Sequence, residues 1–218
     1  ERCEIQLRRL GVETIDLYLI HLFEPLTPPE ETAAALDDLC RAGKIRHYGT
    51  SNHTVEQLRM QRRFGRYEAV QPPYSLLDPA IEKDLLPYCQ AENIGVMVYS
   101  PLHKGLLTGK YRGGETFDDF RQHHPDFQGE RFRQVTAAVQ GLRPLAEKYA
   151  MSIYQLVLAA TLMHPGIHAA VVGIKKAEQI REAAAVMGRT ISREDYFAVR
   201  KALDIAPQRI QDASGKRK

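Results

Sequence analysis

The chain has 218 residues, of which 44% are hydrophobic and 26% charged, an ordinary composition for a water-soluble globular protein. This length predicts a single domain over 1–218, with a polar tail at 206–218. A net charge of +3 is too small to indicate a nucleic-acid partner. No apolar run reaches the roughly 18 residues of a membrane span, so no membrane partner is expected. The three cysteines form no C-x-x-C pattern, which suits reduced thiols in a cytoplasmic protein.

The first residues have the pattern of the end of a helix. Ile5, Leu7 and Leu10 alternate with charged residues, and Gly11 follows as a typical residue just past a helix end. A helix that leads into a buried parallel strand normally follows an earlier strand, because parallel strands need crossover connections. We therefore expect the chain to begin inside a repeating strand–helix unit, with strands missing upstream.

Five apolar runs predict buried β-strands, and polar residues stand at the end of each run. The runs are residues 15–21, 45–52, 69–74, 94–100 and 169–173. Their nearly continuous apolar character favours a parallel sheet that is covered on both faces. Because ligands bind at the carboxyl ends of strands in such folds, the polar residues at these ends are the candidate site.

Helices are predicted between the first four strands from acidic first turns, capping residues and glycine ends. They cover residues 28–43, 54–64 and 79–92. Thr27 and Asp78 are the candidate N-caps of the first and third, and Pro87 should kink or shorten the third.

The region after the fourth strand begins with a long irregular stretch, residues 102–131, rich in Gly, His and Asp. Loops of this length are uncommon in compact domains unless they act as lids or binding loops. His123, His124 and Asp126 suggest a metal site, but we predict none, because adjacent histidines rarely share a metal ion. Helices then follow over 132–149 with an interruption near Pro144, from Ser152 to 164–166, and over 177–187 and 193–203.

This order of elements predicts an α/β fold. A (β/α)8 TIM barrel that is N-terminally truncated, with about five of eight strands present, is the preferred fold class. A doubly wound open sheet is the alternative, and it is disfavoured because no Gly-x-Gly-x-x-Gly follows any strand.

Three segments carry a more specific resemblance. They are Leu-Gly-Val-Glu-Thr-Ile-Asp-Leu-Tyr-Leu-Ile-His at 10–21, Gly-Lys-Ile-Arg-His-Tyr-Gly-Thr-Ser-Asn at 43–52 and Tyr-Ser-Pro-Leu-His-Lys-Gly-Leu-Leu-Thr-Gly-Lys-Tyr at 99–111. In this order and at this spacing they resemble the aldo-keto reductase family of NADP-dependent barrel oxidoreductases. The resemblance covers about residues 1 to 190, and it implies that the chain supplies strands four to eight of the barrel.

The resemblance implies one catalytic residue in the chain. His21 matches the family's active-site histidine, which orients the substrate carbonyl and supports the proton donor. A lone histidine at a strand end would more simply cap a loop. The tyrosine that donates the proton, its lysine and its aspartate are expected upstream of Glu1, because Tyr74 and Tyr99 belong to later strands.

The resemblance further implies a nicotinamide site. Ser51, Asn52 and Gln71 match residues that hydrogen-bond the carboxamide of the cofactor, for which uncharged amide and hydroxyl groups are suited. Tyr99 matches the aromatic residue that stacks on the nicotinamide ring. Taken alone, these residues would be read as turn chemistry and a core tyrosine.

Two further segments match the phosphate and adenosine subsites of NADP(H). The segment that wraps the pyrophosphate and ribose in relatives contains Ser100, Leu102, Lys104, Gly105, Leu106 and Lys110, and Arg121 could join it. Gly173, Ile174, Lys175 and Lys176 match the 2′-phosphate segment before a helix, and Gln179 and Glu182 match contacts to the adenosine end. The alternative for the lysines is a solvated helix face. Ala183 replaces the usual asparagine, which puts the adenine contact in doubt.

The expected function is NADP(H)-dependent reduction of aldehyde or ketone carbonyls, with the chain as a C-terminal fragment that is inactive in isolation. The alternative is a catalytically inactive NADP(H)-binding regulatory relative. The partner is a small-molecule carbonyl substrate, whose identity cannot be read from residues 102–131, and the oligomeric state stays open.

Overall fold

The computed structural model describes residues 1–205, so the predicted polar tail at 206–218 lies outside the described residues. The described chain divides into two compact units. The first contains residues 1–74, 79–99 and 164–171, and the second contains residues 75–78, 100–163 and the chain from 172 onward. The prediction of a single domain stays a prediction.

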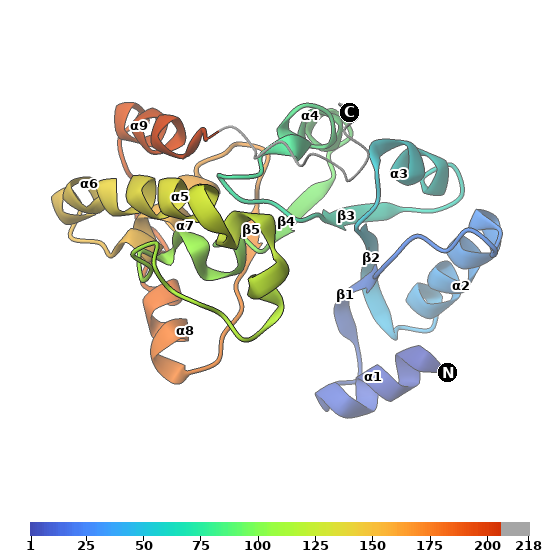
Figure 1. Cartoon of the computed structure of the whole chain (residues 1–218). Helices are drawn as coiled ribbons and strands as arrows, with labels where there is room; N and C mark the ends of the chain where they lie inside the picture. Colours follow the sequence, from blue (N-terminus) through green and yellow to red (C-terminus); the bar gives the residue numbers. More distant parts are fainter. Residues whose placement is uncertain (206–218) are drawn as a thin grey trace, which may run out of the picture. The chain divides into compact units, whose positions relative to one another are not determined.

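A parallel sheet of five strands lies in the first unit (Figure 1). The strands are β1 (Ile15–Ile20), β2 (Ile45–Ser51), β3 (Tyr67–Gln71), β4 (Gly95–Tyr99) and β5 (Ala169–Val171). Each strand pairs in parallel with the next one in the sequence, which confirms the predicted parallel sheet. This sequential order has no reversal point, so it argues against the doubly wound alternative.

The first two helices of this unit are α1 (Arg2–Leu10) and α2 (Pro29–Arg41). Helix α1 ends at Gly11, whose φ of 66° is in the left-handed region, as predicted. The predicted N-cap of α2 was wrong, because Pro28 holds that position in place of Thr27. The backbone N–H of Thr27 instead donates to the carboxylate of Glu24, which ties Thr27 into the preceding turn.

Two shorter helices follow in the first unit. Helix α3 (Val55–Gln61) begins with a capping box formed by Thr54 and Gln57. The predicted helix over 79–92 is divided into a 3₁₀ turn, η1 (Ala80–Glu82), and α4 (Leu85–Ala91). Asp84 caps α4, so Asp78 as the N-cap was wrong. Pro87 lies in the first turn of α4. The N–H that a proline lacks would have no partner within the helix at this position, so the helix tolerates it there.

A pair of buried tyrosines joins helix and sheet in the first unit. Tyr48 of β2 and Tyr67 of β3 pack edge to face, with their ring centroids 5.0 Å apart. The Tyr48 hydroxyl donates to Asp37 of α2 and accepts the backbone N–H of Arg66. Burial raises the pKa of Tyr67 to about 12, so this hydroxyl stays protonated in the core.

The second unit is mainly helical. Its long connecting segment contains three 3₁₀ helices, η2 (His103–Thr108), η3 (Phe120–His123) and η4 (Pro125–Phe127), where the sequence indicated irregular structure. Its α-helices are α5 (Gly129–Gly141), α6 (Arg143–Lys148), α7 (Ile153–Leu162), α8 (Ala177–Ala184) and α9 (Arg193–Leu203). The break before Pro144 and the bounds of α9 are as predicted, whereas α5 begins earlier and α8 ends earlier.

Helix α7 forms the centre of the second unit. It contacts η2, α6, α8 and α9, and most of its side chains are buried, since it is apolar on nearly every face. Ser152 begins it with a capping box completed by Gln155. Within residues 1–205, no helix has the length and apolar character that crossing a membrane requires.

The strand packing makes a testable demand on Gly49. A Cβ atom at this position in β2 would lie 2.1 Å from the carbonyl oxygen of Ala69 in β3, which is backbone and cannot move aside. We expect Gly49→Ala to lower the free energy of unfolding by about 3 kcal/mol, measured by urea denaturation.

Gly95→Ala is the matched control in the same sheet. A Cβ there would be 3.5 Å from the carbonyl oxygen of Glu68, an ordinary contact, so we expect a change below about 1 kcal/mol. Equal losses in the two variants would show that Gly49 is not constrained by close strand packing.

Candidate functional site

Hydrogen bonds join the carboxyl ends of the first strands, where the sequence placed its candidate residues. His21 directly follows β1, and its backbone carbonyl accepts a hydrogen bond of 2.9 Å from Nδ2 of Asn52. Asn52 follows β2 with a φ of 58°, a left-handed conformation that asparagine tolerates better than most residues. The turn after β2 therefore holds the Asn52 amide against the end of β1.

The same amide connects β4 to this group. The Tyr99 hydroxyl donates to Oδ1 of Asn52 at 2.7 Å, and Nδ2 of Asn52 also donates to Oγ of Ser51 at 3.1 Å. Ser51 in turn donates to the backbone carbonyl of Gln71 at the end of β3. The structure thus brings together all five residues that the sequence assigned to the hydride end of the site.

The chemistry that these residues can offer differs from one to the next. Both N–H donors of Asn52 are engaged, but its carbonyl oxygen can accept one further hydrogen bond. Ser51 is 3% exposed and already donates and accepts, so it positions its neighbours. Tyr99 and Gln71 are half-buried and His21 is exposed, which leaves their side chains accessible to a ligand.

A cavity of about 450 Å³ lies in the second unit, within the usual size of ligand pockets. Residues from the turn after β4, η2, η3, α7 and the start of α8 line it. Nine residues predicted from the sequence are among them: Ser100, Leu102, Lys104, Gly105, Lys110, Gly173, Ile174, Lys175 and Gln179.

Three residues predicted for the phosphate and adenosine subsites do not line this cavity. Leu106 is 1% exposed because it packs into the core of the unit. Lys176 is exposed but is not part of the cavity lining, and Glu182 accepts a 2.6 Å hydrogen bond from Ser152. The sequence missed Pro101, Thr108, Asp119, Phe120, Tyr154 and Val172, and Arg121 joins the lining as it suggested.

Positive charge predominates around the cavity. Lys104, Lys110, Lys175 and Arg121 face a single carboxylate, that of Asp119. Asp119 pairs with Arg121, whose hydrogen bonds hold the pKa of this carboxyl below its usual range. The excess of cations suits an anionic ligand such as a phosphate ester.

Two glycines allow the backbone of η2 to approach its neighbours. Gly105 has a φ of 92°, and a Cβ there would lie 3.3 Å from Nζ of Lys110. Gly109 has a φ of 78°, and a Cβ there would lie 2.8 Å from Ile153 of α7. A side chain at either position would therefore be strained, which explains why the segment uses glycine.

The start of α8 differs from the expected anion site. Oε1 of Gln179 accepts hydrogen bonds from the backbone N–H groups of Lys175 at 2.7 Å and Lys176 at 3.0 Å. These two donors are therefore engaged by the protein. The Lys175 side chain is what this segment offers to an anion in the cavity.

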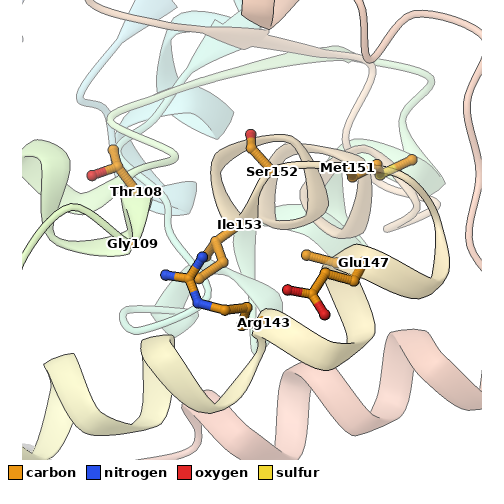
Figure 2. A pocket seen from close by; sticks show the side chains of 8 residues that line it. Thr108, Gly109, Arg143, Glu147, Met151, Ser152 and Ile153 are labelled. Carbon is orange, nitrogen blue, oxygen red and sulfur yellow. The ribbon is translucent and has the colours of Figure 1, made fainter.

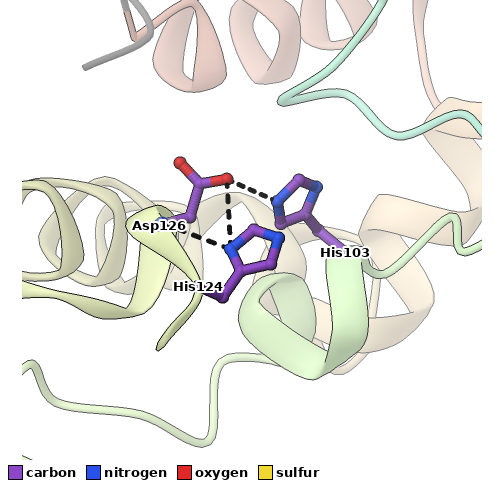
Figure 3. A group of neighbouring side chains, drawn as sticks. All are labelled: His103, His124 and Asp126. Atoms are coloured by element: carbon purple, nitrogen blue, oxygen red, sulfur yellow. Dashed lines mark hydrogen bonds and ion pairs between the residues drawn. The ribbon is translucent and has the colours of Figure 1, made fainter. Parts of the chain in front are cut away.

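A cluster of charged and polar residues joins η2, η4 and α5; Figure 3 shows three of its members, His103, His124 and Asp126. Nε2 of His103 lies 2.8 Å from Asp126, Nδ1 of His103 lies 2.9 Å from Ser75, and Arg131 donates to Asp126 at 2.8 Å. His124 accepts from the backbone N–H of Asp126 at 3.3 Å. Because His103 and Arg131 engage both carboxylate oxygens of Asp126, we interpret the cluster as a structural clamp.

A smaller hollow of about 150 Å³ lies between the ends of η2, α6 and α7 (Figure 2). Thr108, Arg143, Glu147 and Met151 are among the residues that line it. It contains none of the predicted binding residues, so the larger cavity is the candidate ligand site.

The family model described as the Aldo/keto reductase family matches residues 1–204. The chain belongs to this family. Its α/β fold is of the aldo-keto reductase type. The resemblance read from the three sequence segments is thereby confirmed.

Individual relatives agree with this assignment. The chain is 38% identical to aldo-keto reductase YhdN of Bacillus subtilis (strain 168) over 207 residues, and 34% identical to the NADH-specific methylglyoxal reductase of Escherichia coli (strain K12) over 203 residues. These matches cover 94% and 92% of this chain and 62% of each relative. The solved glycerol dehydrogenase AKR11B4 from Gluconobacter oxydans matches with a TM-score of 0.88 and 38% identity, over 93% of this chain and 62% of that one.

The chain thus spans about 62% of the length of these relatives. The matches do not show that barrel strands are missing upstream, and that expectation stays a prediction.

The clamp makes a prediction about acid stability. His103, and then Arg131, hold the pKa of Asp126 well below its usual range, so its ionised form stabilises the fold. This contribution is complete above the unfolded-state pKa of about 4 and is lost as the pH falls toward the folded-state value. We expect Asp126→Asn to lower the free energy of unfolding by about 2 kcal/mol at pH 7, less than for a fully buried pair, and by progressively less below about pH 4.

Asp118→Asn is the matched control, since Asp118 is exposed in the same segment. We expect it to change stability by less than about 0.5 kcal/mol at either pH. A loss in Asp126→Asn that does not depend on pH would contradict the electrostatic role.

Proposed function

We propose that the chain forms the NADP(H)-binding part of a reductase that converts aldehyde or ketone carbonyls to alcohols. The observation that carries this proposal is the cationic cavity of the second unit, which nine residues expected from the cofactor resemblance line together. The hydrogen-bonded strand ends of the first unit supply the second set of expected residues.

Each set, taken by itself, has chemistry that suits part of a nicotinamide dinucleotide. At the strand ends, the free acceptor position of Asn52 suits the amino group of a carboxamide, and the half-buried ring of Tyr99 offers a stacking surface. In the cavity, Lys104, Lys110 and Lys175 suit phosphate groups. A bound nicotinamide dinucleotide would supply the hydride, and His21 would orient the substrate carbonyl through its imidazole.

The preference for NADP(H) over NAD(H) rests on Lys175. This lysine lines the cavity at the start of α8, on the segment that matches the 2′-phosphate site. The family includes both kinds of named protein: the Escherichia coli relative is NADH-specific, and a Schizosaccharomyces pombe relative, 31% identical, is named with NADP(+). A phosphate-binding lysine favours NADP(H) for this chain.

We match no residue of this chain to the family's proton donor. Of the four catalytic groups implied by the family resemblance, the chain provides only His21. The substrate is proposed to be a small carbonyl compound and the setting cytoplasmic, with no role for nucleic acid or membrane. This same shortage supports the second candidate, an NADP(H)-binding regulatory relative without catalysis.

The proposal predicts that the 218-residue chain by itself shows little or no NADPH-dependent reduction of small aldehydes such as methylglyoxal, because it lacks a positioned proton donor. Absorbance of NADPH at about 340 nm measures the rate, and binding is measured separately by the quenching or enhancement of its fluorescence. Robust turnover would refute the placement of the donor, whereas failure to bind NADPH would refute the cofactor site.

A second prediction concerns the lysines. In the full-length protein, we expect Lys175→Ala combined with Lys176→Ala to weaken NADPH binding by about 10- to 100-fold, because a charge-assisted contact to the 2′-phosphate is lost. NADH lacks this phosphate, so its affinity should change by less than about threefold. Isothermal titration calorimetry measures both dissociation constants.

Lys201→Ala on the exposed surface of α9 is the control for lost positive charge, and it should leave both affinities unchanged. Equal weakening of NADPH and NADH in the double variant would count against a 2′-phosphate site at these lysines.

A further inference from the structure

The hydroxyl of Tyr154 has no hydrogen-bond partner in the described structure, and the residue belongs to the wall of the large cavity. Tyr154 is the second residue of α7 and lines the large cavity, although the residue is only 8% exposed. Its buried hydroxyl oxygen has no hydrogen-bond partner among the residues that the structure describes. An unpaired buried hydroxyl is destabilising, and most such groups in proteins have a partner.

The other unpaired buried polar groups do not share this location. In the described part of the chain they are Thr50, His53 and Thr161, and none of them lines the cavity. Thr161 lies on the same helix as Tyr154 and is 0% exposed. Tyr154 therefore combines an unsatisfied hydroxyl with a position in the wall of the cavity.

Tyr154 lies on the part of the cavity wall next to α8. Its neighbours in the first turn of α7, Ser152 and Gln155, donate hydrogen bonds to the side chain and to the backbone carbonyl of Glu182 in α8. Lys175 and Gln179, at the start of α8, line the same cavity. This part of the wall therefore belongs to the end of the cavity where the proposed function places the adenosine half of the dinucleotide.

The chemistry of the hydroxyl suits an uncharged acceptor. Burial, and then the negative charge of Glu182, raise the pKa of Tyr154, so the group remains a neutral O–H donor near neutral pH. Adenine ring nitrogens and ribose oxygens are acceptors of this kind.

We propose that the Tyr154 hydroxyl donates a hydrogen bond to the adenosine portion of the bound dinucleotide and so contributes to cofactor recognition. This inference rests on the proposed function, because it requires a dinucleotide in the cavity. It adds a contact that the family resemblance did not indicate, at the end of the site where Ala183 replaces the usual asparagine.

Tyr154→Phe in the full-length protein tests the inference, because it removes one oxygen atom and leaves the ring in place. We expect the affinities for NADPH and for 2′,5′-ADP to fall about three- to tenfold, measured by isothermal titration calorimetry, since one neutral hydrogen bond is lost. The affinity for nicotinamide mononucleotide should not change. Without ligand, the variant should melt at the same temperature as the parent protein or up to about 4 °C higher, because an unsatisfied group has been removed.

Thr161→Val is the matched control, since it removes another unpaired buried hydroxyl from α7 away from the cavity. It should leave all three affinities unchanged. A Tyr154→Phe variant that binds 2′,5′-ADP as tightly as the parent overturns the inference and leaves the proposed function intact. A lower melting temperature in this variant also overturns it, because the hydroxyl would then have a partner in the free protein. Failure of the parent protein to bind any of the dinucleotides would remove the proposed function and this inference with it.

Discussion

Parallel pairing of the strands is the constraint on which the candidate site depends. Because β1 to β4 run in the same direction, their carboxyl ends lie along one edge of the sheet. Residues that follow these strands therefore lie near one another although they are far apart in the sequence. Asn52 then fixes the arrangement, since its amide bonds the backbone after β1, the side chain of Ser51 and the hydroxyl of Tyr99. Position 52 requires a side chain with both hydrogen-bond donors and an acceptor, and asparagine also tolerates the left-handed backbone conformation at this position.

The sequence predicted those parts of the molecule that local chemistry determines. The strands were recognisable as apolar runs, and the helices predicted from about Thr54 and after Ser152 are confirmed. In the structure, a glutamine three residues later completes a capping box at each of these helix starts. The predicted N-caps Thr27 and Asp78 were wrong because of local interactions. The backbone N–H of Thr27 bonds the Glu24 carboxylate, and α4 begins only after Asp84, with Pro87 in its first turn. Such competition between neighbours is not visible in the propensity of a single residue.

The candidate site shows the same division. Residues directly after strands or on the glycine-containing turn were predicted, because their place follows from the sheet and from the resemblance to a family. Asp119, Phe120 and Tyr154 were missed because they reach the cavity through the packing of η3 and α7, which no periodic pattern encodes. Glu182 was assigned to the ligand, and in the structure its carboxylate accepts a hydrogen bond from Ser152, 30 residues away in the sequence.

The two groups of site residues differ in charge, as the proposed function requires of residues for the uncharged and the phosphate-bearing parts of a nicotinamide dinucleotide. The strand ends offer amide, hydroxyl and imidazole groups, which can orient a carboxamide and a carbonyl without placing a fixed cation near a hydride donor. The cavity instead offers lysine and arginine side chains, whose charge suits the phosphate groups of the proposed cofactor. In the sequence, the change from one kind of chemistry to the other occurs at a single peptide bond, between Tyr99 and Ser100. Substitutions at Lys104, Lys110 or Arg121 would therefore change the charge of the cavity without removing a hydrogen bond of the Asn52 network.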